Sequence, residues 1–126
     1  MGDNNTGYAY SSSGSQSSIT QTGDNNNGHA YSLYGGNENL ISLTQRGNTN
    51  TARLRQQGSF NTATVLQEGN SNTLMGLEST PNYSNIATQQ GDGNIMSLTQ
   101  SGDGNMLHFG QTGNGNSATI MQGPLN

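Results

Sequence analysis

"QRGNTNTARLRQQGSFNTATVLQEGNSNT", residues 45–73, contains nearly the same segment twice and begins a third copy. Gln, Gly and Asn recur every 11 residues, whereas the residues between them vary. The three sets are Gln45, Gly47 and Asn50, then Gln56, Gly58 and Asn61, then Gln67, Gly69 and Asn72. Because a short internal repeat usually corresponds to one structural unit that stacks on its neighbours, this period is the main guide to the fold.

The repeat extends along most of the chain. Stepping by 11 reaches Gln89, Gln100, Gln111 and Gln122, with Glu78 as the exception, and an upstream two-residue insertion in 33–38 leads back through Ser32, Gln21 and Tyr10. The recurrent glycines are Gly23, Gly47, Gly58, Gly69, Gly91, Gly102 and Gly113. The recurrent asparagines are Asn26, Asn39, Asn50, Asn61, Asn72, Asn94, Asn105 and Asn116.

Each unit divides into a seven-residue segment, N-x5-Q, and a four-residue connector that contains Gly. In 61–67, the side chains of Asn61, Ala63, Val65 and Gln67 lie on one face, which is the alternation of a β-strand. The inward positions of other units are mostly apolar: Ile41/Leu43, Ala52/Leu54, Met96/Leu98, Leu107/Phe109 and Ala118/Ile120. Connectors rich in Gly, Asn and Asp favour the left-handed backbone of tight turns.

Two strands and two turns form a rung of 22 residues, which predicts an all-β, two-sheet β-solenoid of the cross-β type. The five expected rungs are 15–32, 39–56, 61–78, 83–100 and 105–122. Residues 1–14 are a polar segment, either a secretion leader or a partial strand, and 123–126 form a tail. Stacked rungs lie about 4.8 Å apart, so the Gln and Asn amides, with a donor and an acceptor each, are expected to form ladders along the solenoid.

The composition favours assembly over a conventional core. Only 27% of the residues are hydrophobic and 8% are charged, with a net charge of −4 and no cysteine. Chains of low charge that are rich in Gln and Asn are prone to β-assembly. Three arginines are too few for a phosphate-binding surface, and no apolar run reaches the length of a membrane span, so we expect neither nucleic-acid binding nor membrane insertion.

Over residues 15–122 the sequence resembles the curlin repeat of bacterial curli, S-x5-Q-x-G-x2-N-x5-Q. The resemblance implies a secreted structural subunit that polymerises into extracellular amyloid fibres of the biofilm matrix, with roles in adhesion and aggregation. It also implies a nucleator subunit and outer-membrane secretion machinery as partners. The uncharged end, "MQGPLN", favours a major fibre subunit, with a nucleator as the alternative.

Glu78 is the acidic residue on an inward grid position, between neutral neighbours in its expected column. Burial of an ionised carboxylate is unfavourable, so we expect Glu78, with the "STPN" turn behind it, to slow polymerisation, unless its side chain reaches water.

Other chemistry is weakly indicated. His29 and His108 are expected on opposite sheets, so we predict no shared metal site, and we expect no cofactor. The Asp residues fall mainly in turns and form no Ser/His/Asp or paired-carboxylate arrangement, so we predict no catalysis. Outward Met75, Leu77, Ile95 and Met121 are expected on one sheet, either as scattered residues or as a strip for lateral bundling.

A solenoid whose outward Thr rows bind ice is the alternative from another class, since Thr62 and Thr64 form one T-x-T and Thr20, Thr44 and Thr88 are expected to share a column. The expected rows are interrupted by Leu40, Met106, Ile86, His108, Leu66 and Gly110. A monomeric adhesin would need capped ends.

Overall fold

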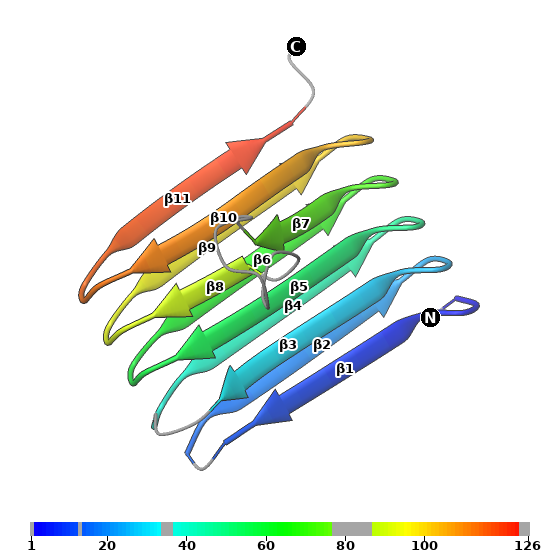
Figure 1. The fold of residues 1–126 in the computed structure, drawn as a ribbon. Helices are drawn as coiled ribbons and strands as arrows, with labels where there is room; N and C mark the ends of the chain where they lie inside the picture. Colours follow the sequence, from blue (N-terminus) through cyan, green and yellow to red (C-terminus); the bar gives the residue numbers. More distant parts are fainter. Residues whose placement is uncertain (1, 13, 34–36, 77–86, 124–126) are drawn as a thin grey trace.

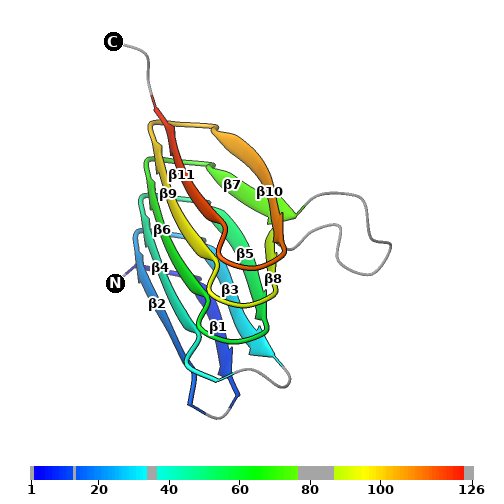
Figure 2. The ribbon, with the colours of Figure 1, turned by 90° about the vertical axis from the view of Figure 1, so that its left-hand side faces the viewer.

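The computed structural model of the chain describes residues 2–12, 14–33, 37–76 and 87–123. These residues form strands in two flat, facing sheets (Figures 1 and 2). They contain no helix, and so none that is long and apolar enough to cross a membrane. The strands are β1 (Thr6–Ser11), β2 (Gln16–Thr22), β3 (Asn27–Leu33), β4 (Leu40–Arg46), β5 (Thr51–Gln57), β6 (Thr62–Glu68), β7 (Thr73–Gly76), β8 (Ala87–Gln90), β9 (Ile95–Ser101), β10 (Met106–Thr112) and β11 (Ser117–Gln122).

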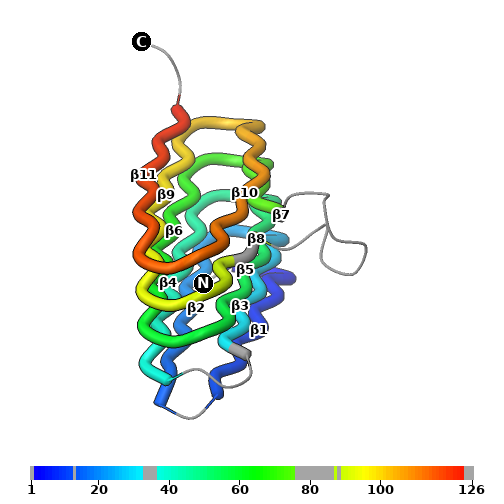
Figure 3. Tube along the Cα trace, turned by 60° about the vertical axis from the view of Figure 1, so that its left-hand side comes forward, coloured from blue at the N-terminus to red at the C-terminus, as the bar shows by residue number. Residues whose placement is uncertain are grey.

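The chain winds as a β-solenoid. Sheet A contains β1, β3, β5, β7, β8 and β10, and sheet B contains β2, β4, β6, β9 and β11. Every strand pairing is parallel, and the register places identical grid positions above one another, as in Gln45↔Gln67↔Gln100. From β1 to β10 the chain makes about four turns of the solenoid and thereby forms five stacked layers. The connections between strands stack along both edges (Figure 3). The predicted all-β solenoid is therefore confirmed.

One layer of sheet A is shared by two short strands. β7 and β8 both pair with β5 on one side and with β10 on the other. Leu54 of β5 is opposite Ala87, whereas Phe109 of β10 is opposite Gly76, so Gly76 and Ala87 occupy the same level of the sheet. Ala87 follows Gly76 by 11 positions, which is one period of the repeat, yet the two residues share one layer.

This shared layer corrects the predicted rungs after residue 76. Rungs 83–100 and 105–122 are wrong in their sheet order, because β8 and β10 lie in sheet A and β9 and β11 lie in sheet B, the reverse of the earlier rungs. The predicted apolar strip is wrong for the same reason: Met75 is on sheet A, and Ile95 and Met121 are on sheet B. Leu77 lies outside the described residues.

The upstream grid also shifts by one residue. Tyr10 was expected at an inward grid position, but it pairs with Tyr31 and faces outward, and Ser11 is the residue opposite Ser32. Because side chains alternate between the two faces of a strand, a shift of one residue exchanges the inward and outward sets.

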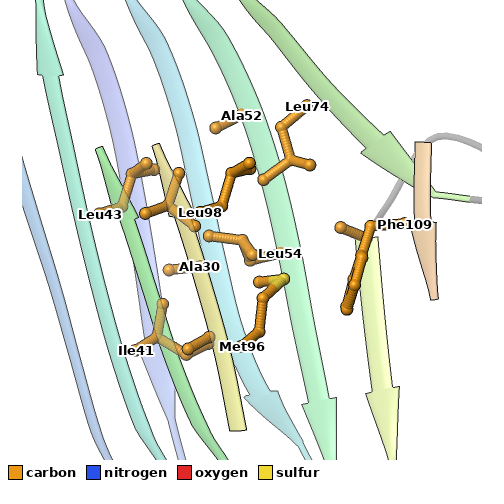
Figure 4. Packing of buried hydrophobic residues seen from close by; sticks show 12 residues of the cluster. Ala30, Ile41, Leu43, Ala52, Leu54, Leu74, Met96, Leu98 and Phe109 are labelled. Carbon is orange, nitrogen blue, oxygen red and sulfur yellow. The ribbon is translucent and has the colours of Figure 1, made fainter. Parts of the chain in front are cut away.

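A thin apolar layer fills the space between the sheets (Figure 4). It includes the predicted pairs Ile41/Leu43, Ala52/Leu54 and Met96/Leu98, which are almost fully buried. Phe109 is buried near one end, and Leu107, Ala118 and Ile120 pack against the cluster. The same inward faces also bury amides at their ends, and these amides form the candidate site.

Candidate functional site

A continuous glutamine ladder runs along sheet B. The Nε2 group of each glutamine donates to Oε1 of the next, with a distance of 2.8 Å at all four steps. Its members are Gln21, Gln45, Gln67, Gln100 and Gln122. Each amide also donates across the interior to a backbone carbonyl of sheet A. For example, Gln67 Nε2 donates to the Thr51 carbonyl at 3.0 Å. The ladder therefore joins successive layers and ties the two sheets together.

The matching column of sheet A is incomplete. Gln56 donates to Gln89 at 2.9 Å, and Gln89 donates to Gln111 at 2.8 Å. The two preceding layers have Ser11 and Ser32 at this position. Ser32 Oγ and Gln56 Oε1 are buried and have no hydrogen-bond partner, because the serine side chain is too short to reach the amide above it. The column thus contains two buried polar atoms of the kind that destabilise a fold.

Two asparagine ladders lie at the N-terminal ends of the strands. The backbone N–H of Asn50 donates to Asn26 Oδ1 at 3.0 Å, and Asn50 Oδ1 accepts from the backbone N–H of Asn72 at 3.0 Å. Asn50 Nδ2 also donates to the Gly69 carbonyl of the next layer at 2.8 Å. One column contains Asn5, Asn26, Asn50, Asn72 and Asn105, and the other contains Ser15, Asn39, Asn61, Asn94 and Asn116.

The recurrent glycines allow the turns to stack closely. Gly47 has φ +110°, and a Cβ atom built there would lie 2.0 Å from the Gly69 carbonyl oxygen. That carbonyl accepts the hydrogen bond from Asn50, so the glycine and asparagine of each unit act together. Gly104 also has a positive φ, +71°, but a Cβ atom built there would have nothing within 4 Å. The same close approach to the next layer occurs at Gly2, Gly23, Gly58, Gly69 and Gly91.

The sequence indicated the first layer only as one of two alternatives for residues 1–14, a partial strand, and its ladder contacts were not predicted. Asn26 Nδ2 donates to Asn5 Oδ1 at 3.1 Å, and the backbone N–H of Asp3 donates to Asp24 Oδ1 at 2.8 Å. The signal was present, because "GDNN" at 2–5 is repeated at 23–26.

Glu78 lies outside the described residues. The position above Gln56 that was predicted for it is occupied by Gln89.

The two histidines lie on the same sheet, not on opposite sheets as predicted. His29 is in β3 and His108 is in β10, in one outward column with Arg53 and Met75 between them. Among the described residues no group of three potential metal-binding side chains occurs. Burial, and secondarily the charge of Arg53, lowers the pKa of His29 below its ordinary 6.5.

The fold and its ladders define a repetitive structural protein in which each layer presents the same hydrogen-bonding groups as the next. Residues 47–75 match the family model described as "Curlin associated repeat". No curated protein and no solved structure shows significant similarity to the chain. Residues 47–75 thus carry a curlin-associated repeat, which supports the predicted resemblance to the curlin-repeat family.

Proposed function

We propose that the chain is a structural subunit that self-assembles head-to-tail into extracellular, curli-like amyloid fibres of the biofilm matrix. The observation that carries this proposal is the ladder of sheet B, which begins with Gln21 in β2 and ends with Gln122 in β11. A second chain stacked on β11 would place its own Gln21 above Gln122 and continue the ladder. Each subunit would add five layers, or about 24 Å, to the fibre.

The strand edges support the same arrangement. In the described part of the chain, β1 and β2 at one end, and β10 and β11 at the other, each have a strand on one side only. Such an edge is a template for another chain. At the junction, inward Leu107 and Phe109 of β10 would meet Gly7 and Ala9 of the next β1, so large side chains would face small ones.

The match to the curlin-associated repeat supports a wider role. We assign the chain to the major fibre subunits, with a nucleator subunit and outer-membrane secretion machinery as partners and the bacterial surface as its location. The fibre would contribute to adhesion and aggregation, and we propose no enzymatic activity.

To test this proposal, the purified full chain is diluted from denaturant at neutral pH and examined by electron microscopy and fibre diffraction. We expect fibres in electron micrographs and a reflection near 4.8 Å along the fibre axis. Gln122→Glu should slow elongation, because an ionised carboxylate at the growing ladder cannot donate to its neighbour. Gln90→Glu is the matched control, since Gln90 is exposed and off the ladder. A chain that stays monomeric, or equal slowing by both variants, would contradict the proposal.

Ice binding is the second candidate, because the true register gives sheet B a continuous outward hydroxyl column: Ser18, Ser42, Thr64, Ser97 and Thr119. Met106, His108 and Gly110, which were expected to interrupt the Thr rows, belong to sheet A. Thr88, predicted to share a column with Thr20 and Thr44, is also on sheet A. The neighbouring columns still contain Leu66 and Met121. Thermal hysteresis, measured on the fresh chain and on the Thr64→Lys variant, would decide whether this column binds ice.

A further inference from the structure

The outer face of sheet A carries a compact group of aromatic and cationic side chains on three adjacent strands. In one column Tyr8, His29 and Arg53 lie opposite one another, and in the next column Tyr10, Tyr31 and Arg55 do so. We call these six residues the aromatic–arginine face. All six belong to one chain, so the face is complete in a single folded chain and does not depend on fibre formation.

The aromatic part of this face is continuous. The rings of Tyr8 and His29 are stacked with centroids 6.2 Å apart, and Tyr31 lies 5.6 Å from Tyr8 and 5.9 Å from His29. His29 Nδ1 and the Tyr31 hydroxyl are 2.8 Å apart, within hydrogen-bond distance. Tyr8 and Tyr10 are each about half exposed, at 52% and 50%. Flat rings with polar edges are therefore available to a ligand from solvent.

The charge of this face differs from that of the rest of the molecule. The chain has a net charge of −4 and three basic residues, of which Arg53 and Arg55 project here. None of the described outward residues on sheet A is an aspartate or a glutamate. The third arginine, Arg46 on sheet B, pairs with Glu68 at 2.9 Å. On sheet A, Arg55 Nη2 donates to Gln57 Oε1 at 2.9 Å.

We propose that the aromatic–arginine face binds an acidic polysaccharide of the uronate type. Its carboxylates would pair with the guanidinium groups of Arg53 and Arg55, which form strong, directional hydrogen bonds with carboxylates. Its sugar rings would lie on Tyr8, Tyr10 and Tyr31, whose rings offer an apolar surface and whose hydroxyls offer hydrogen bonds.

The number of cations favours a polysaccharide over a nucleic acid. Double-stranded DNA carries one negative charge per ~1.7 Å, and its affinity depends on neutralising several phosphates together. Two arginines per chain, on a protein of net charge −4, can neutralise few phosphates and so contribute little to such an affinity. A uronate polymer has a lower charge density and needs fewer cations, and its neutral ring surfaces can use the tyrosines.

The test measures binding of a fluorescent polyuronate oligosaccharide to the full chain by anisotropy, beside a neutral glucan of equal length and a single-stranded oligonucleotide. We expect the polyuronate to bind most tightly, and more weakly as salt rises. The double variant Arg53→Gln/Arg55→Gln should weaken its binding by about tenfold or more, because two charge-assisted pairs are lost. Arg46→Gln removes the same kind of charge from the other sheet and should change binding less than about twofold.

Two further variants make the test independent of how the double variant folds. Arg53→Lys/Arg55→Lys keeps both charges and should give an intermediate loss, because lysine cannot pair with a carboxylate in the bidentate geometry. Tyr8→Thr should also weaken binding severalfold, whereas Met106→Thr, at an exposed position of β10 on the same sheet, should not. The proposal is overturned if Arg46→Gln weakens binding as much as the double variant. Equal binding of the neutral glucan, or tighter binding of the oligonucleotide, would also overturn it.

Discussion

Sheets A and B are built from the same 11-residue unit, yet their glutamine columns differ. Sheet B has an amide at all five layers, whereas sheet A has serine at the two layers nearest the N-terminus. In those two layers the other inward residues of sheet A are also small: Gly7, Ala9, Gly28 and Ala30. Backbone pairing is nevertheless complete in these layers, from Thr6 to Ser11 and from Asn27 to Leu33, so the side-chain ladder is not required in every layer for the strands to align. The difference locates the weakest bonding in β1 and β3.

The largest effect is expected from Gln67→Ala, in the middle of the complete column. Gln67 accepts from Gln45 and donates to Gln100 and to the Thr51 carbonyl, so its loss leaves buried partners unsatisfied. We expect the free energy of unfolding, measured in urea, to fall by about 3 kcal/mol. Gln90→Ala, at an exposed position outside the columns, should change it by less than about 0.5 kcal/mol. Similar losses in both variants would remove the basis of the ladder argument.

Gln56→Ala should lower the free energy of unfolding in the same urea experiment by about 1 kcal/mol less than Gln67→Ala does. The reason is that Gln56 Oε1 already lacks a partner, so the substitution removes only the donations to Gln89 and to the Leu40 carbonyl. If the two substitutions are equally costly, the defect in sheet A has no energetic consequence.

Ser32→Gln should repair the column and raise the free energy of unfolding by about 1 kcal/mol. The new Nε2 group would lie below Gln56 Oε1, which is now without a partner, and would also face the interior as the other glutamines do. Ser42→Gln makes the same change on the outward face of sheet B and should have little effect. Loss of stability in Ser32→Gln would show that the thin N-terminal layers have no room for the amide.

The smallest expected effect is a pH dependence confined to sheet A. Burial, and then Arg53, lowers the pKa of His29, whose other titratable neighbours are Tyr8 and Tyr31. The folded state therefore binds fewer protons than the unfolded state just below pH 6.5. The contribution of His29 to stability is complete above pH 6.5 and is lost as the pH falls towards the lowered pKa. Urea unfolding of the chain and of His29→Gln between pH 5 and 8 should diverge only in this window.

Much of this architecture is predictable from the period alone. The alternation within 61–67 indicated which residues face the core, and the turn glycines follow from the connectors. The assignment of later strands to sheets was wrong for a definite reason. Ala87 lies at the level of Gly76 but 11 positions, or one period, later in the chain, so every later residue stays on the 11-residue grid while its strand moves to the other sheet. A search for periodicity cannot detect such an insertion. Only the irregular "LESTPNYSNI" at 77–86 marked it.

The glutamine ladder of sheet B also has an electrical consequence. At each of its four steps the earlier residue donates from Nε2 and the later residue accepts at Oε1, so all these amide N–H bonds point towards β11. Backbone dipoles in a sheet largely cancel, but aligned amides add, as peptide units do in a helix. The ladder therefore contributes a dipole moment along the solenoid axis with its positive pole at the β11 end. Parallel solenoids lying side by side would repel through this moment, whereas antiparallel neighbours would attract.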